Sequence, residues 1–414
     1  MAKFEERGDY HSVPVPVHAR RSALQILLAF LGFIIVVGVM AVGGGLAPQM
    51  PLRSLLGVII LGNLVLGVFA AIAGWVGAES GKSFNLLLSD AFSDSSWRVA
   101  SLYVPIVLVG WYAIEAAIFG HLVADSLGVG NLATERVVIF VSGILFATTA
   151  YLGFSAIRYV SLALVPILVA AGSYAIYAAS MVEEAGATFG FGDTQIGLGA
   201  GLAIVMGTWI MGSLTAVQDL TRFCRTPLAG ALVGFFGIVL ANTFTLLVGA
   251  AGAGLTGESD PAAILVSLGL ISVALLFGVA NIWTTNDNNM YSASLHVARV
   301  ARLERPKAVL ICALLGAAFA IFEPYKLGFL FTFLGFLGGT APALGAVVLL
   351  NYWKQRSGLD QPSGTSLPAW VGWIGGSAVG LAVGGWLAPF LGFAIGMGFF
   401  TAIDAMLARR ERAS

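Results

Sequence analysis

The sequence predicts an all-α integral membrane protein with twelve transmembrane helices. Of its residues, 58% are hydrophobic and only 10% are charged, and the mean hydropathy is +0.92. Ordinary soluble domains carry about 25% charged residues. The apolar residues also gather into segments of about 20 residues, the length at which a helix crosses a bilayer. These observations together predict a bundle of helices embedded in lipid.

An even number of apolar segments places both termini on one side of the membrane. No other segment is long enough to form a second soluble domain. We therefore predict a cytoplasmic tail over 1–22, one transmembrane domain over 23–407 and a second cytoplasmic tail over 408–414. The predicted spans are residues 23–46, 55–78, 99–123, 135–153, 157–181, 196–217, 228–253, 261–286, 308–322, 327–352, 369–386 and 388–407.

Positive charges predict the orientation of these spans. If the N-terminus is cytoplasmic, only Arg53, Arg136 and Lys326 of the 21 basic residues lie outside. Cytoplasmic loops of membrane proteins carry an excess of Lys and Arg. The first 22 residues are polar and lack the short apolar core and cleavage site of a signal peptide. We therefore predict a protein of the cell (inner) membrane with both termini in the cytoplasm.

Composition also argues against several classes of function. Acidic and basic residues number 21 each, and no basic face predicts a nucleic-acid partner. Cys224, Cys312 and the four histidines show no disulfide or metal-binding spacing. A membrane enzyme usually carries clustered metal-binding acids or histidines, whereas the polar run 286–289 contains only Asp287. We predict neither an enzyme nor a cofactor, and no obligate protein partner is indicated.

A cluster of polar side chains, ANIWTTNDNNMY at residues 280–291, follows the apolar segment 264–279 directly. Each unpaired polar group inside a bilayer costs several kcal/mol. The adjacent hydroxyls of Thr284 and Thr285, with backbone carbonyls nearby, are hard oxygen ligands that suit Na⁺. Thr and Asn also join transmembrane helices by hydrogen bonds. The residues alone favour a Na⁺ site and hydrogen bonds between helices equally.

The third and sixth predicted spans contain candidates for a substrate site. Trp111 and Glu115 are four residues apart, so they share one helix face. An intramembrane carboxylate beside an aromatic plane suits a flat ring that forms hydrogen bonds, although packing or a structural pair is the alternative. Trp209 provides a second aromatic face or packs on a neighbouring helix. Thr208 and Gly212 lie beside it in the sequence.

Glycines interrupt the same two regions of the chain. Gly32, Gly38 and 43–45 lie in the first span, and Gly207 and Gly212 lie in the sixth. Small residues allow either close helix packing or a broken helix, and paired interruptions are typical of inverted-repeat transporters.

Asp219 and Arg222 follow at the cytoplasmic end of the sixth span. Residues three apart on a helix are neighbours, so we interpret the two as a local ion pair or as part of a cytoplasmic gate.

These residues resemble the nucleobase:cation symporters, and among them the bacterial cytosine permeases. The most specific match is NIWTTNDN at residues 281–288, which is similar to the eighth-helix signature of that family. Weaker matches are Pro14-Val15-Pro16 before the first span, Gly62-Asn63-Leu64 in the second, Gly110-Trp111 in the third, and Asp219 with Arg222-Phe223 after the sixth.

The resemblance implies a leucine-transporter type of fold. Two inverted five-helix repeats would cover about 23–181 and 196–352, with broken first and sixth helices, and two extra helices would cover about 369–407. A Na⁺ between the first and eighth helices would bind the carbonyls of Gly32, Ile35 and Asn281 and the hydroxyls of Thr284 and Thr285. The substrate ring would stack between Trp111 and Trp209.

Two positions depart from the family pattern. Leu108 replaces a glutamine expected three residues before the tryptophan in cytosine permeases, and Glu115 replaces a glutamine found in hydantoin-type members. A carboxylate accepts hydrogen bonds from ring N–H or amino groups more strongly than an amide. We therefore expect a substrate that presents donors to Glu115, with Asn281 or Asn286 binding the rest of the ring.

The sequence thus predicts a secondary active symporter that imports a nucleobase with Na⁺ by alternating access. Cytosine is the leading substrate, followed by purines, hydroxymethylpyrimidine-like precursors and hydantoins. Proton coupling through Glu115 is the alternative within transport, and a membrane receptor that does not transport is a third hypothesis.

Overall fold

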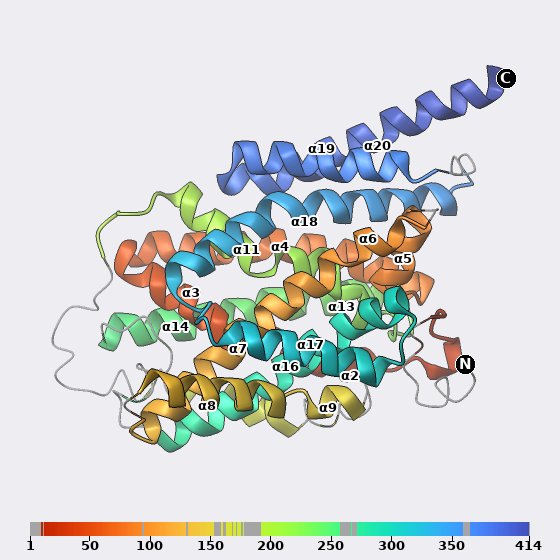
Figure 1. The fold of residues 1–414 in the computed structure, drawn as a ribbon. Coiled ribbons are helices and arrows are strands. Elements are labelled where there is room, and N and C mark those ends of the chain that lie inside the picture. Colours follow the sequence, from red (N-terminus) through yellow and green to blue (C-terminus); the bar gives the residue numbers. More distant parts are fainter. Residues whose placement is uncertain are drawn as a thin grey trace.

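The computed structural model describes residues 10, 12–92, 95–129, 131–152, 192–256, 271–358 and 365–413, with isolated positions between 159 and 177 and position 266. These ranges form helices and no β-strand, which confirms the all-α class (Figure 1). The longer helices are α2 (Ala23–Ile34), α3 (Val37–Leu46), α4 (Leu52–Ser80), α7 (Tyr103–Ser126), α8 (Leu132–Leu145), α11 (Leu198–Leu214), α13 (Pro227–Phe236), α14 (Thr243–Thr256), α16 (Ile271–Ala301), α17 (Arg305–Ala320), α18 (Leu327–Arg356), α19 (Leu367–Val383) and α20 (Ala388–Ala413). The shorter elements are η1 (Val17–Ala19), η2 (Ala47–Gln49), α5 (Phe84–Ala91), α6 (Trp97–Ser101), α9 (Thr148–Leu152), α12 (Ala216–Thr221), the π-helix η4 (Gly237–Asn242) and η5 (Gly385–Leu387).

Six helices in the described part are long and apolar enough to cross a membrane, and a bent pair makes a seventh candidate. Ten of the predicted spans coincide with a described helix or with consecutive helices, and the described part of the eighth, 271–286, lies in α16. The exception is 157–181, which lies largely outside the described residues, so the count of twelve stays a prediction.

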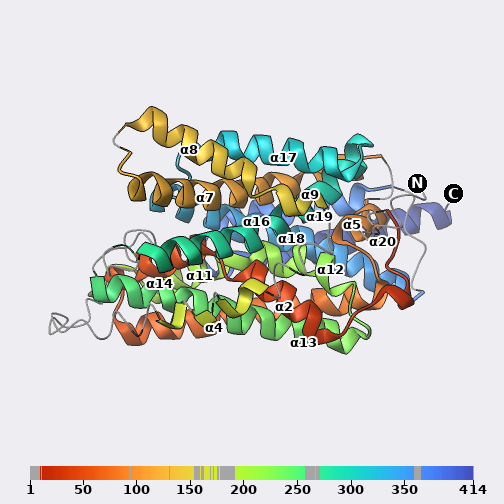
Figure 2. The ribbon, with the colours of Figure 1, turned by 90° about the horizontal axis from the view of Figure 1, so that it is seen from below.

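The helices form an elongated bundle with α16 inside it. In Figure 2, α7, α8 and α17 lie on one side of α16, whereas α2, α4 and α13 lie on the other. Helix α16 packs against α7, α17 and α2. Helices α19 and α20 pack on each other and on α18 along a further side (Figure 1). The element η1 and the last turns of α20 lie at the same end of the bundle.

The first predicted span is broken into α2 and α3, which meet at an angle of 56°. Ile35 and Val36 between them have extended backbone, with ψ of 92° and 123°. The break falls in the run Ile34-Ile35-Val36-Val37, where branched side chains favour extended conformations. It frees backbone N–H and C=O groups at a depth where water cannot bind them.

The break in the first span does not fall at a glycine. Glycines in α3 instead allow close packing, because a Cβ on Gly43 would lie 2.1 Å from the Leu246 carbonyl oxygen of α14. The sixth span is interrupted at Thr215, between α11 and α12, with φ −126° and ψ −59°. Its hydroxyl donates to the Met211 carbonyl at 2.9 Å and so satisfies the helix end.

The predicted end of the eighth span, at residue 286, is wrong. Helix α16 continues through the polar cluster to Ala301. The side chains of the cluster from Asn286 to Asn289 are buried by other helices, and several are hydrogen-bonded, so the helix need not end to hydrate them.

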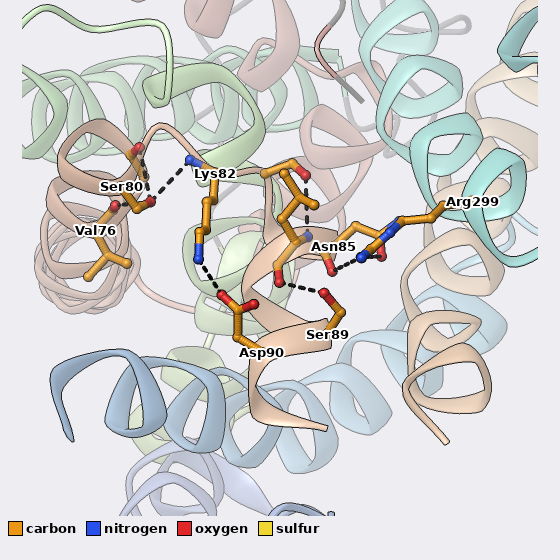
Figure 3. A network of polar contacts seen from close by, with 10 residues as sticks. Val76, Ser80, Lys82, Asn85, Ser89, Asp90 and Arg299 are labelled. Carbon is orange, nitrogen blue, oxygen red and sulfur yellow. Dashed lines mark hydrogen bonds and ion pairs between the residues drawn. The ribbon is translucent and has the colours of Figure 1, made fainter. Parts of the chain in front are cut away.

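Helix α5 was not predicted, and it joins α4 and α16 at the end of the bundle that contains η1. Lys82 pairs with Asp90 at 2.6 Å (Figure 3). Arg299 of α16 donates to the Asn85 carbonyl at 3.0 Å, and the Asn85 amide donates to the Leu295 carbonyl at 3.1 Å. These contacts fix α5 across the end of α16.

Candidate functional site

A cavity lies beside the break in the first helix. The cavity lies between residues of α2, α3, α7, α11 and α16, together with Val36 at the break. Its lining residues are Phe33, Val36, Val39, Leu108, Trp111, Thr208, Trp209, Met211, Gly212, Thr285 and Asn289.

The predicted aromatic pair faces this cavity. Trp111 comes from α7 and Trp209 from α11, and each is held by an edge-to-face contact. The Trp111 ring lies 5.6 Å from Phe333 at 67°, and the Trp209 ring lies 5.0 Å from Phe33 at 87°. Such contacts fix the orientation of an aromatic plane. The geometry therefore supplies two oriented rings around one space.

Gly212 gives the Trp209 indole its position. A Cβ on Gly212 would lie 2.3 Å from Cε3 of Trp209. The indole therefore lies directly over the glycine, on its own helix. Thr208, next to it, lines the cavity and donates its hydroxyl to the Val205 carbonyl at 2.6 Å.

The predicted cation ligands come together where α16 meets the break. The Thr285 hydroxyl oxygen lies 3.5 Å from the Gly32 carbonyl oxygen and 3.3 Å from that of Ile35. A cation the size of Ca²⁺ or Na⁺ binds oxygens at about 2.4 Å, which separates ligands at right angles by about 3.4 Å. The Thr285 hydroxyl therefore lies at a distance from each of the two carbonyls that also suits a pair of ligands of one cation.

The other two predicted ligands are also on α16: the hydroxyl of Thr284, the residue before Thr285, and the carbonyl of Asn281, one turn before it. Thr284 donates its hydroxyl to the Asn281 carbonyl at 3.0 Å and to the Ala280 carbonyl at 3.0 Å. The hydroxyl and the Asn281 carbonyl are thus adjacent oxygens. The residues present fit a monovalent cation bound by uncharged oxygens.

The side chain of Asn281 joins α16 to both sides of the helix break. Its amide nitrogen donates to the Ile35 carbonyl at 2.5 Å, and its amide oxygen accepts from the Val37 N–H at 2.9 Å. Both bonds use backbone groups that the break leaves without helical partners. Asn281 therefore fixes the break, and it is absent from the residues that line the cavity in the described structure.

Glu115 of α7 also contacts the break. Its Oε1 accepts from the Gly38 N–H at 2.7 Å, and it is fully buried. Gly38 lies in the first turn of α3, where the helix dipole favours a negative charge. The second oxygen, Oε2, has no hydrogen-bond partner among the described residues. Glu115 lies beside the cavity but is not one of its lining residues.

Asn289 lines the cavity, whereas Asn286, which the sequence predicts there, does not. The Asn289 amide donates to the Asn286 amide oxygen at 3.3 Å, so Asn286 contacts the lining residue from behind. On a helix, Thr285 and Asn289 are one turn apart and share a face. That periodicity could have selected Asn289 once Thr285 had been assigned to the site.

A second polar network, which sequence reasoning missed, supports Thr208 from outside the cavity. Asn242 donates to the Thr208 hydroxyl at 3.0 Å and to the Asn63 amide oxygen at 2.7 Å. Asn242 is the last residue of the π-helix η4, and such bulges often accompany functional sites. The sequence signal for this network is a single amide side chain within an otherwise apolar span. The signal for Glu115 is of the same kind, a single acid within an apolar span.

Asp219 and Arg222 lie at the η1 end of the bundle, apart from the cavity. Arg222 donates from Nε to the Asp219 backbone oxygen at 3.1 Å, so their contact involves the main chain. The Asp219 carboxylate accepts from the Phe84 N–H at 2.9 Å. Arg222 also donates to the Tyr10 carbonyl at 2.9 Å and to the Tyr291 hydroxyl at 3.0 Å. These bonds join the N-terminal segment, α5, α12 and α16.

Solved structures with the same fold are transporters. The closed conformation of Mhp1, a nucleobase-cation-symport-1 family transporter with bromovinylhydantoin bound, aligns with a TM-score of 0.78 at 19% identity, covering 96% of this chain and 94% of that one. Mhp1 in its inward-facing conformation gives 0.74 at 17% identity, covering 97% and 93%. A Na⁺-coupled sialic acid symporter gives 0.67 at 12% identity, covering 94% and 90%.

Sequence relatives define the family. Cytosine permease of Escherichia coli O157:H7 is 29% identical over 389 residues, which cover 93% of this chain and 90% of the relative. Cytosine permease of Escherichia coli K12 is 28% identical over the same length. Fold, cavity and relatives together define an integral membrane transporter rather than an enzyme. Residues 14–367 match the family described as permease for cytosine/purines, uracil, thiamine, allantoin, and the chain belongs to that family.

Proposed function

We propose that this protein is a secondary active symporter that imports a nucleobase, with cytosine as the leading substrate, driven by a Na⁺ gradient. The observation that carries the proposal is the position of Thr285. This residue lines the cavity and also lies 3.3 to 3.5 Å from two carbonyl oxygens at the helix break. One residue therefore belongs to both candidate sites, which gives a direct route for coupling between an ion and a substrate.

In this proposal the substrate and the ion bind in adjacent sites that meet at Thr285. Trp111 and Trp209 clamp the ring, and Thr208 and Asn289 offer polar groups. Glu115 does not line the cavity in the described conformation, so it accepts from the donor edge of the ring only after a movement on substrate binding. Na⁺ binds the carbonyls and hydroxyls proposed above, and it holds α16 against α2. A substrate that then enters meets an ordered site and loses less conformational entropy on binding.

The proposed architecture follows the transporters of the same fold. Twelve spans form two inverted five-helix repeats and two extra helices, and the broken helices α2–α3 and α11–α12 occupy corresponding positions. We place the protein in the cell membrane with both termini in the cytoplasm. Arg20, Arg222 and Arg299 form their hydrogen bonds at the end that contains η1, and a basic end of this kind supports the orientation.

Uptake of radiolabelled cytosine into proteoliposomes tests this function. We expect accumulation with an inward Na⁺ gradient and little without one, and unlabelled purines, pyrimidines and hydantoins should compete according to their fit. Binding without accumulation in sealed vesicles would instead identify a receptor. Transport of another competing ring, but not of cytosine, would show that Leu108 and Glu115 have changed the specificity.

Proton coupling through Glu115 is the second candidate, for a related ring such as a hydroxymethylpyrimidine-like precursor or a hydantoin. The observation in its favour is the buried Oε2 oxygen, which has no hydrogen-bond partner in the described part of the chain. Uptake that persists without Na⁺ and stops when the pH gradient is removed would favour this candidate.

Gly212→Ala tests the position of the Trp209 ring. Because the new Cβ would lie 2.3 Å from the indole, the ring must move. Overpacking of this kind costs about 1–3 kcal/mol, so cytosine affinity should fall by about tenfold. Equilibrium binding to the purified protein measures the change. Gly335→Ala is the matched control, because a Cβ there meets nothing within 4 Å. Equal affinities of the two variants would contradict this position of Trp209.

A further inference from the structure

Asn242 lies behind the wall of the cavity and contacts a residue that forms part of that wall. It ends the π-helix η4, its side chain is fully buried, and it is not among the residues that line the cavity. Its amide nitrogen donates to the hydroxyl of Thr208, which is on α11 and lines the cavity. Asn242 can therefore influence a bound ring only through Thr208.

The hydrogen bonds of this network all run in one direction, because a backbone carbonyl lies at each end. At one end, the Asn63 amide nitrogen of α4 donates to the Ile59 carbonyl at 2.9 Å, and a carbonyl can only accept. The Asn63 oxygen therefore faces Asn242 and accepts from its nitrogen at 2.7 Å. The same nitrogen donates its second hydrogen to Thr208 at 3.0 Å. At the other end, Thr208 donates to the Val205 carbonyl at 2.6 Å.

This direction determines what the Thr208 hydroxyl offers to the cavity. A hydroxyl group has one hydrogen to donate and two lone pairs that accept. The hydrogen of Thr208 is used by Val205, and Asn242 occupies one lone pair. One lone pair remains on a residue that lines the cavity. The partner that suits it is an N–H group of the substrate.

A hydrogen bond that joins two helices is the other explanation for an amide at position 242. The oxygen of this amide, Oδ1, is buried and has no hydrogen-bond partner among the described residues. A buried acceptor without a partner is unfavourable, and a leucine of similar volume would avoid it. Helical threonines adopt two χ1 rotamers, and the N–H of Asn242 favours the one that keeps the Thr208 hydroxyl beside it. This effect on Thr208 accounts for the amide.

We propose that Asn242 is a positioning residue of the substrate site. Asn63 orients the Asn242 amide, and that amide holds the Thr208 hydroxyl so that an acceptor faces the cavity. The substrate presents an N–H, from a ring nitrogen or an amino group, to this acceptor. The inference rests on the proposed function, because it concerns a ring bound in the cavity. It adds two residues, on α4 and η4, that affect substrate affinity without contacting the ring.

A double-mutant cycle tests whether Asn242 acts through Thr208. Thr208→Val should weaken equilibrium binding of radiolabelled cytosine to the purified protein about tenfold, because a buried N–H of the ring loses its partner. Asn242→Leu should weaken binding about fivefold. If Asn242 acts through Thr208, the double variant also binds about tenfold more weakly than the wild type. Independent effects would multiply to about fiftyfold, and that result overturns the proposal.

Thr208→Ser and Asn351→Leu separate positioning from general damage. Thr208→Ser keeps the hydroxyl, so it should keep most of the affinity, and adding Asn242→Leu to it should again weaken binding. Asn351→Leu removes another buried amide, on α18, which is not among the residues that line the cavity. Its affinity should equal that of the wild type. An affinity of Asn242→Leu equal to that of Asn351→Leu would also overturn the proposal.

Asn63→Leu provides the second route if Asn242→Leu does not fold. This change removes the acceptor that orients the Asn242 amide. It should weaken cytosine binding in the wild-type background and leave it unchanged in the Thr208→Val background. Equal losses in the two backgrounds reject the positioning role.

The wild type separates failure of this inference from failure of the proposed function. Binding is measured with cytosine, and with adenine and hydantoin if cytosine does not bind. A wild type that binds none of the three rejects the proposed function and this inference with it. A wild type that binds one of them, with effects of Asn242→Leu and Thr208→Val that multiply, rejects the positioning role alone.

Discussion

Trp111→Ala should lower the affinity for cytosine by about ten- to a hundred-fold. Stacking of a base on an aromatic side chain is worth about 1–3 kcal/mol, and the Trp111 ring lines the cavity in an orientation fixed by Phe333. Equilibrium binding of radiolabelled cytosine to the purified variant measures the loss. Trp111→Phe, which keeps an aromatic plane, should retain most of the affinity.

A matched control separates the loss of stacking from general damage. Trp386 in η5 is 43% exposed and lies apart from the cavity, so Trp386→Ala removes an indole of the same size without touching the site. Its affinity should equal that of the wild type. If Trp111→Ala binds cytosine as well as Trp386→Ala does, Trp111 is not part of a ring clamp.

Loss of the Thr285 hydroxyl should abolish most of the stimulation by Na⁺. The Thr285→Ala variant removes the oxygen that lies between the Gly32 and Ile35 carbonyls. An interaction between a polar group and a charge is worth about 1.5–3 kcal/mol, so the Na⁺ concentration for half-maximal uptake should rise at least about tenfold. Thr284→Ala should act in the same direction, and Thr285→Ser should restore Na⁺ dependence.

Uptake at a series of Na⁺ concentrations, normalised to the amount of reconstituted protein, measures this effect. Thr332→Ala is the control, because within the described residues that exposed hydroxyl on α18 bonds only to the Gly328 carbonyl one turn earlier. Normal Na⁺ stimulation in both Thr284→Ala and Thr285→Ala would reject the assigned cation site.

Both predictions depend on the break in the first helix, which links the two candidate sites. Asn281 binds backbone groups on both sides of it, and Glu115 binds the first turn of α3 from α7. A movement of the break would therefore change the contacts of α7 and of α16 together. This arrangement gives a physical route for the coupling that the proposed symport requires.

The sequence by itself determined the membrane class, the existence of most helices and the residue types of the site. Hydropathy over about 20 residues depends only on local composition. It therefore predicts a membrane-spanning helix whichever neighbours that helix packs against. An acid such as Glu115, or the polar cluster around Thr284, is conspicuous for the same reason. A polar group in an apolar segment needs partners, whichever residues supply them.

Only the tertiary structure decided which partners those are. The bond from Val37 to Asn281 spans 244 positions and that from Gly38 to Glu115 spans 77, and no local pattern encodes such pairs. The predicted end at residue 286 is wrong because burial by other helices, rather than sequence polarity, determines how far α16 continues. Likewise, Asn289 rather than Asn286 faces the cavity, because helix rotation is fixed by packing against α2, α7 and α17. Sequence periodicity specifies faces of a helix, but the neighbouring helices determine what each face meets.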